Sequence, residues 1–68
     1  MKIKIKSYNG ELPDYLTLDK EYEVLEYYED VDSFYIVDDQ EDEIYTLRTS
    51  THHLNGGEWE IVEWTLKK

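Results

Sequence analysis

The sequence predicts a small all-β protein, with five short strands curled into one barrel domain over residues 1–68. Apolar and polar residues alternate with a period of two through most of the chain, as in strands with one face on a core. The alternating segments are short and are separated by polar turns, and none keeps the 3.6-residue period of a long helix. A sheet this small must bury one face and hide its edges, and a barrel does both.

The first two predicted strands cover residues 1–8 and 15–28. In the first strand, Ile3 and Ile5 alternate with lysines, which indicates one buried and one solvated face. The segment NGELPD then interrupts the pattern with a glycine and a proline. The second strand, YLTLDKEYEVLEYY, resumes the alternation. Its expected core residues are Leu16, Leu18, Tyr22 and Val24, and Thr17, Asp19, Glu21 and Glu23 are expected on the opposite face.

Three more strands are predicted at residues 34–39, 43–49 and 58–66. The segment FYIVDD is apolar on both faces, so we expect this strand to be central in the sheet. The segments EDVDS and DDQED, on either side of it, are rich in residues that favour turns. EIYTLRT and EWEIVEWTL complete the set of five strands.

The segment STHHLNGG, between the last two strands, predicts one short helical turn near residues 50–54. Ser50 is the expected N-cap, because a serine hydroxyl can accept a hydrogen bond from a free backbone N–H of the first turn. Asn55 and Gly56 are the expected stop, because both residues tolerate the left-handed conformation that ends many helices.

The charges of the first and last strands predict that these two strands pair. Lysines at positions 2, 4 and 6 can lie opposite Glu58, Glu60 and Glu63. Opposite charges across strands contribute roughly 0.2–1 kcal/mol per pair. The lysine-bearing strand is thus explained without a ligand.

The composition limits the size of the core and the class of partner. A chain of 68 residues buries only about 60% of its unfolded surface, and with no cysteine it depends on seven Tyr, two Trp and one Phe for packing. Seventeen acidic residues against seven basic ones give a net charge of −10, which argues against direct nucleic-acid binding. Because no signal peptide or membrane span is evident, we expect a cytoplasmic protein.

The segment YLTLDKEYEVLEYYED, residues 15–30, resembles the diverging-turn segment of Src-homology-3-like barrels. The following SFYIVDD and DEIYTLRTSTHHL are similar in layout to the next two strands and the helical turn of that fold. Small acidic proteins with such strands are typical of bacteriophage and prophage, which implies the cytoplasm of a bacterial host. Phe34-Tyr35 stands where the peptide-binding members have tryptophan, and STHHL lacks their proline and tyrosine. The resemblance therefore implies the fold and not the proline-peptide ligand.

No catalytic, cofactor-binding or metal site is predicted. Thr51, His52 and His53 bring a hydroxyl and imidazoles together, but no nucleophile-elbow pattern occurs, and solvated turn histidines explain them. The acidic residues of 38–43 lack the glycine and the spacing of a calcium loop. We therefore expect a protein that is not an enzyme.

Tyrosines beside acidic turns predict a protein-binding face. Three pairs of consecutive large residues, Tyr27-Tyr28, Phe34-Tyr35 and Ile44-Tyr45, must each place one member outside the core. Tyrosine is enriched at the centres of protein interfaces. The candidate binding residues are Tyr28, Tyr35, Tyr45, Glu21, Glu23, Asp38, Asp39 and Asp42. The expected partner is a host protein that this chain binds and modulates.

Two alternative functions remain open from the sequence. Same-face carboxylates on a strand, such as Glu21 and Glu23, repeat every ~6.6 Å, comparable to successive phosphates, so the chain could mimic DNA and inhibit a nucleic-acid-processing enzyme of restriction, repair, transcription or CRISPR type. The other alternative is a self-associating structural protein, a weak homo-oligomer through an apolar edge near Trp64 and Leu66.

Overall fold

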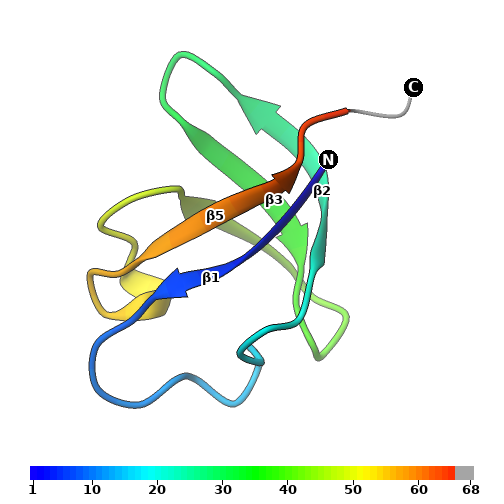
Figure 1. Cartoon of the computed structure of the whole chain (residues 1–68). Coiled ribbons are helices and arrows are strands. Elements are labelled where there is room, and N and C mark those ends of the chain that lie inside the picture. Colours follow the sequence, from blue (N-terminus) through cyan, green and yellow to red (C-terminus); the bar gives the residue numbers. More distant parts are fainter. Residues whose placement is uncertain (66–68) are drawn as a thin grey trace.

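The structure is a computed structural model that describes residues 1–65. One antiparallel sheet contains all five strands in the order β4-β3-β2-β1-β5 (Figure 1). The strands are β1 (Lys2–Ser7), β2 (Tyr22–Tyr28), β3 (Ser33–Val37), β4 (Glu43–Leu47) and β5 (Glu58–Glu63), and one 3₁₀ turn, η1 (His52–Leu54), precedes β5. The predicted all-β class, with five strands and one helical turn, is confirmed.

The sheet is curled but is not closed into the predicted barrel (Figure 1). β4 and β5 are its two edge strands. The backbone N–H of Trp59 in β5 donates to the carbonyl oxygen of Arg48, just after β4, over 2.8 Å. This bond links β4 and β5 without a strand ladder. The chain between the two strands forms η1, and the ladder partner of β5 is β1. The outcome is an open sheet whose edges approach each other.

β2 bends and thereby belongs to both halves of the sheet. Its first residues, Tyr22 and Glu23, pair with β1, and the part from Val24 onward pairs with β3. The register shifts between Val24 and Glu26, so Leu25 is an extra residue in the ladder. Such a bulge bends a strand and increases its twist, which is how this sheet curls around its core.

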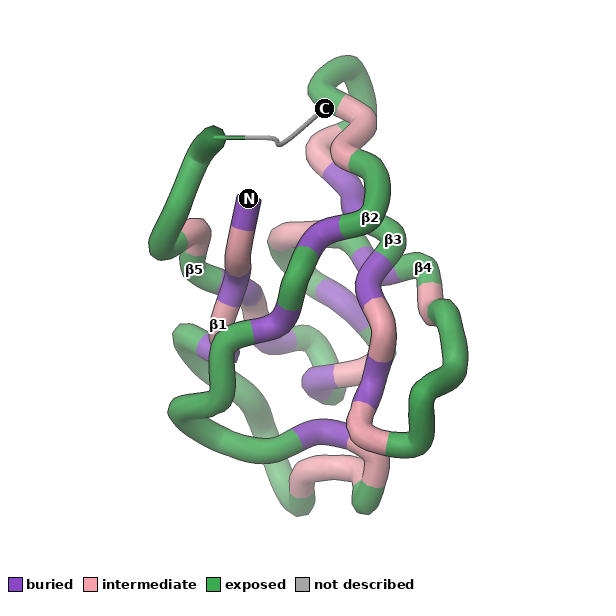
Figure 2. Tube along the Cα trace, turned by 90° about the vertical axis from the view of Figure 1, so that its right-hand side faces the viewer, coloured by how far each residue is buried: buried purple, intermediate pink, exposed green. Residues whose placement is uncertain are grey.

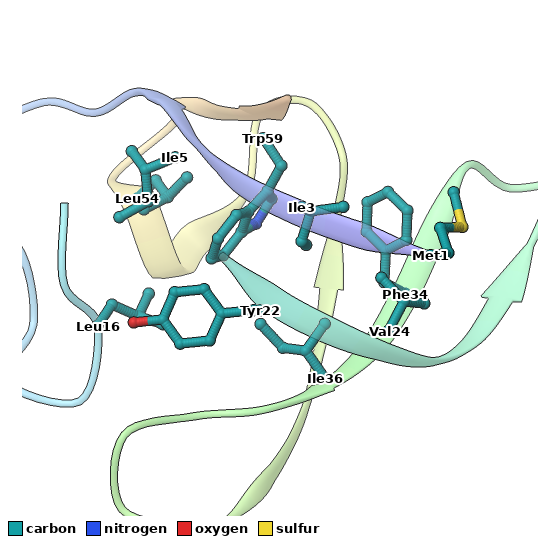
Figure 3. Packing of buried hydrophobic residues seen from close by; sticks show 10 residues of the cluster. All are labelled: Met1, Ile3, Ile5, Leu16, Tyr22, Val24, Phe34, Ile36, Leu54 and Trp59. Atoms are coloured by element: carbon teal, nitrogen blue, oxygen red, sulfur yellow. The ribbon is translucent and has the colours of Figure 1, made fainter. Parts of the chain in front are cut away.

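The core lies on the concave side of the curled sheet (Figure 3). Figure 2 shows buried positions alternating with half-buried ones in the first part of β1 and with exposed ones in the first half of β2, as the period of two predicts. The ring of Tyr22 packs edge-on against Trp59, with centroids 5.8 Å apart. Each fully buried large apolar side chain contributes roughly 1.5–3 kcal/mol. The core residues are Met1, Ile3, Ile5, Leu16, Tyr22, Val24, Phe34, Ile36, Leu54 and Trp59.

The predicted pairing of the first and last strands is confirmed. Lys2 lies opposite Glu63, and Lys4 lies opposite Glu60. Lys6 Nζ and Glu58 Oε1 form an ion pair at 3.3 Å. The central position of the third strand is confirmed as well, since β3 has neighbours on both sides. Its outer face nevertheless carries an exposed residue, Tyr35.

The predicted second strand begins seven residues too early. Residues 15–21 form turns, in which Asp19 has a left-handed φ of 67°, so the alternation there does not belong to a strand. Leu16 reaches the core, but Leu18 is 45% exposed and was wrongly expected inside. The ends of the other predicted strands lie within three residues of those in the structure, and the starts of β4 and β5 coincide.

The helical turn also differs in its first residue. Ser50 has a φ of 52° and lies outside the turn, and Thr51 is the N-cap, without a side-chain capping bond. The predicted stop is confirmed, because Asn55 is left-handed with a φ of 53° and Gly56 follows with a φ of 92°. Leu66, the last residue of the predicted fifth strand, lies outside the described residues.

Candidate functional site

Three tyrosines from three adjacent strands meet on the outer face of the sheet. The ring centroids of Tyr35 on β3 and Tyr45 on β4 are 5.2 Å apart, because these residues are cross-strand partners. Tyr28 on β2 lies 6.1 Å from Tyr35 and 6.4 Å from Tyr45. Leu47 lies two residues after Tyr45 and so points to the same side. We call Tyr28, Tyr35, Tyr45 and Leu47 the tyrosine face.

The tyrosine face is exposed, although its rings cover a polar residue beneath them. Tyr35, Tyr45 and Leu47 have 36%, 43% and 40% of their surface exposed. Ser33 lies between Tyr28 and Leu47 in the ladder and is completely buried. Its hydroxyl oxygen accepts a hydrogen bond of 2.8 Å from the Tyr45 hydroxyl. The rings are thus held in place, which lowers the entropy lost when a partner covers them.

A carboxylate also belongs to this face. Glu26 lies opposite Tyr35 in the ladder, and its Oε2 accepts a hydrogen bond from the Tyr28 hydroxyl. This bond and the nearby negative charge raise the pKa of Tyr28 from 10.0 to about 12. Tyr28 is therefore neutral at physiological pH and orients Glu26 beside the aromatic rings.

The turns at both ends of the tyrosine face are acidic. The turn between β2 and β3 lies next to Tyr28, and the turn between β3 and β4 leads into the strand of Tyr45. The one basic residue adjoining the face in sequence, Arg48, is held by Asp32, with Nε and Oδ2 2.7 Å apart. The exposed acids around the face are Glu26, Glu29, Asp30, Glu41, Asp42 and Glu43. An aromatic centre with an acidic rim results.

Two of the acids predicted to bind a partner hold the chain together instead. Asp38 is only 7% exposed, and its Oδ1 accepts backbone N–H groups of Gln40 and Asp42, each over 2.9 Å. These bonds shape the β3–β4 turn, as Asx turns do. The carboxylate of Asp38 therefore offers little surface, whereas Asp42 is exposed at the rim.

Asp39 connects the same turn to the segment before β2. Its carboxylate accepts hydrogen bonds from Lys20 Nζ, from the Thr17 hydroxyl over 2.6 Å and from the Tyr22 hydroxyl over 3.0 Å. Desolvation raises the pKa of Asp39, but these three bonds outweigh it and hold the pKa below its ordinary 3.8. The side chain thus has a structural use.

The remaining predicted acids lie away from the tyrosine face. Glu21 precedes β2 and is exposed, and Glu23 lies opposite Lys2 of β1. Two residues of the face were missed by sequence reasoning. Leu47 could have been found from its two-residue spacing to Tyr45. Glu26 could not have been found in this way, because the extra residue at Leu25 shifts the register of β2 by one and so places Glu26 opposite Tyr35.

Of the two histidines, His53 holds a structural position. Nε2 of His53 donates to the carbonyl oxygen of Tyr45 over 2.9 Å, and its Nδ1 is hydrogen-bonded to the Tyr15 hydroxyl over 2.8 Å. Thr51 is buried, and its hydroxyl is hydrogen-bonded to that of Thr46 over 2.7 Å. His52 is exposed. The Thr51 hydroxyl is therefore buried against Thr46 and is not hydrogen-bonded to either neighbouring imidazole.

Residues 1–65 contain neither a cavity nor a group of three or more His, Asp and Glu side chains placed to hold a metal ion. No helix within this range is long and apolar enough to cross a membrane. Comparison of the chain with protein-family models, with curated proteins and with solved structures gave no match. What the chain does is therefore inferred from its own residues.

Proposed function

We propose that this chain is a non-enzymatic interaction protein that binds and modulates another protein through its tyrosine face. The observation that carries the proposal is the packing of Tyr28, Tyr35 and Tyr45 against one another on the outside of the sheet. An SH3-like classification, an origin in a phage genome and a bacterial host protein as partner belong to the same proposal, on the resemblance of residues 16–54.

The composition of the face supports this function. Interfaces have an apolar centre in which tyrosine is enriched and a polar rim that remains accessible to water. The tyrosine face has both parts, since three rings and Leu47 form its centre and exposed carboxylates surround it. An exposed cluster of large side chains on a small protein needs such an explanation more than a single exposed leucine does.

DNA mimicry, the main alternative, receives less support from the arrangement of charges. A mimic needs a row of carboxylates without neighbouring bases. On β5, however, Glu58, Glu60 and Glu63 face the lysines of β1. Glu23 faces a lysine as well. Mimicry stays a prediction that depends on the acidic turns alone.

The test is to isolate a partner and measure its affinity for matched variants. The protein is immobilised, proteins captured from bacterial lysate are identified by mass spectrometry, and each is purified for calorimetry. The double variant Tyr28→Ala/Tyr35→Ala should weaken binding by about tenfold or more, as for central interface tyrosines. Tyr8→Ala is the control, because Tyr8 is exposed outside the sheet's tyrosine face.

Three results would count against the proposal. One is an unchanged affinity of the double variant whose circular dichroism shows a retained fold. Another is a partner that loses its bound DNA when this protein binds, with a steep salt dependence, which would favour mimicry. The third is an oligomer as the only complex formed, which would favour self-association, with Trp64→Ala as the variant to test next.

A further inference from the structure

We propose that the tyrosine face receives an arginine side chain, so that the partner docks through a basic segment. This inference rests on the proposed function and adds the chemistry of the partner. The relevant juxtaposition is that of two neighbouring aromatic rings, Tyr35 and Tyr45, with the carboxylate of Glu26.

The ring geometry suits one flat cation. A guanidinium is attracted to an aromatic face when it lies within about 6 Å of the ring centroid. The centroids of Tyr35 and Tyr45 are only 5.2 Å apart, and the two planes are inclined by 54°. One guanidinium above their junction can therefore be in range of both rings. The Tyr28 ring, 6.1 Å from Tyr35, extends the platform on the β2 side.

The charges around the platform are complementary to arginine. Glu26 is fixed beside the rings by the Tyr28 hydroxyl and has a second carboxylate oxygen with which to accept a hydrogen bond. The exposed acids of the two turns add negative potential at both ends of the face. Three of the basic side chains are already engaged in ion pairs, Lys6 with Glu58, Lys20 with Asp39 and Arg48 with Asp32.

The openness of the face favours arginine over lysine. A guanidinium is planar, stacks on aromatic rings and binds a carboxylate through two parallel hydrogen bonds. An ammonium is compact and strongly hydrated, and it gains most where aromatic walls enclose it. The described part of the chain has no such enclosure, because no cavity is present there.

Some backbone carbonyls at the sheet edge beside the face already accept hydrogen bonds. A partner is therefore expected to bind the side chains of the face and not to add a strand to the edge. The Tyr45 carbonyl of edge strand β4 accepts a hydrogen bond from His53, and the Arg48 carbonyl just beyond accepts one from Trp59. A partner strand would have to displace these bonds to extend the sheet there. Docking on the tyrosine face requires no such displacement.

The experiment compares two peptides of equal length and charge, one alternating arginine with glycine and the other lysine with glycine. Each is titrated into the isotope-labelled protein at low salt, and ring and backbone resonances are followed by NMR. The arginine peptide should shift the resonances of Tyr28, Tyr35 and Tyr45 and bind about two- to fivefold more tightly than the lysine peptide, the factor expected for an exposed cation–π contact.

Matched variants identify which group is responsible. Tyr35→Leu keeps an apolar side chain but removes the aromatic face, so it should abolish the preference for arginine. Glu26→Gln should weaken both peptides while leaving the fold intact, because Glu26 is exposed. Tyr8→Leu, the control, should bind like the unmodified protein.

Equal affinity for the two peptides, or shifts confined to acidic turns far from the tyrosines, would overturn the inference. The proposed function can fail separately. If Tyr28→Ala/Tyr35→Ala loses the captured partner while the arginine peptide leaves the tyrosines unshifted, the face binds a partner by other chemistry. If the arginine peptide binds there but the double variant keeps its partner, the site is not the one used for that partner.

Discussion

Trp59 of β5 donates its indole Nε1–H to the hydroxyl oxygen of Thr46 on β4, over 2.8 Å, and both side chains are buried. Thr46 is also hydrogen-bonded to Thr51, over 2.7 Å. These bonds join the two edge strands of the sheet where no ladder does. A buried polar junction thus takes the place of the missing strand pairing.

The first prediction concerns this junction. Thr46→Val preserves shape but leaves the Trp59 N–H and the Thr51 hydroxyl without this partner in the core, so it should lower the free energy of unfolding by about 1–3 kcal/mol. Urea denaturation followed by tryptophan fluorescence measures the loss. Thr49→Val at an exposed position is the control, with a change within about 0.5 kcal/mol. Equal effects of the two variants would contradict the role of the junction.

Gly57 provides a second prediction. A Cβ at this position would lie 2.1 Å from the backbone oxygen of Ser7, which cannot move without disturbing β1. Gly57→Ala should therefore cost more than about 3 kcal/mol, the upper range for overpacking. Gly56→Ala is the matched comparison: it has room for the methyl group and strains only its φ of 92°, so about 1–2 kcal/mol is expected. Thermal unfolding measures the stability of both variants. If Gly56→Ala is less stable than Gly57→Ala, the expected clash with the Ser7 backbone does not decide the stability.

The ion pair of Lys6 and Glu58 predicts that swapping the two charges restores stability lost by either single change. Lys6→Glu places two carboxylates side by side and should destabilise the protein by about 0.2–1 kcal/mol, as should Glu58→Lys through its own like charges. Combining both changes restores opposite charges, so the double variant should regain much of the loss at low salt. Chemical denaturation of all four proteins gives the coupling, and purely additive losses would mean that the pair contributes nothing.

Asp39 predicts a pH dependence. Its pKa is lowered in the folded chain, so its carboxylate adds stability at pH values above the unfolded pKa, and this contribution disappears as the pH falls through the folded-state pKa, below 3.8. Asp39→Asn should cost about 1–2 kcal/mol at neutral pH, through weakened bonds to Thr17, Lys20 and Tyr22. The difference from the unmodified protein should shrink in acid. Asp14→Asn, at an exposed position, controls for net charge; a difference that stays constant with pH would rule out this linkage.

Tyr28 predicts a separate titration. Its pKa of about 12 follows chiefly from the hydrogen bond to Glu26, so Glu26→Gln should return the pKa towards 10.0. The ring carbon attached to the hydroxyl reports ionisation of each tyrosine in NMR spectra. Glu21→Gln serves as the charge-matched control and should leave Tyr28 unchanged. If Tyr28 of the unmodified protein titrates at its ordinary pKa, its hydroxyl does not donate to Glu26, and Glu26 is not oriented by Tyr28.

The strands could be predicted wherever one face of the strand is buried and the other faces water, because apolar and polar residues then alternate. Ile3 and Ile5 alternate with lysines, and the complementary glutamates of β5 indicated the pairing of two strands far apart in sequence. The period of two failed in residues 15–21, because Leu16 and Leu18 have the spacing of a strand while Asp19 adopts a left-handed turn conformation. Alternation therefore predicts burial only if the backbone stays extended.

The candidate site was only partly accessible from sequence. Consecutive large residues showed that one of each pair must point outward, and Tyr28, Tyr35 and Tyr45 do so together. Asp38 shapes its own turn through bonds to the backbone of Gln40 and Asp42, a local Asx-type role. The role of Asp39 depends on where the β3–β4 turn meets Thr17, Lys20 and Tyr22, and such contacts are set by tertiary packing, so the local sequence does not distinguish Asp39 from its exposed neighbours.

The pairing of Lys2 with Glu63 has a mechanical consequence. The outer ends of β1 and β5 lie side by side, so a force that pulls Lys2 and Glu63 apart acts across the ladder and along its hydrogen bonds. The load then falls on one pair at a time, and the two strands peel open from that end. Under tension β1 and β5 should separate one residue pair at a time, at an unfolding force that does not follow the melting temperature of the protein.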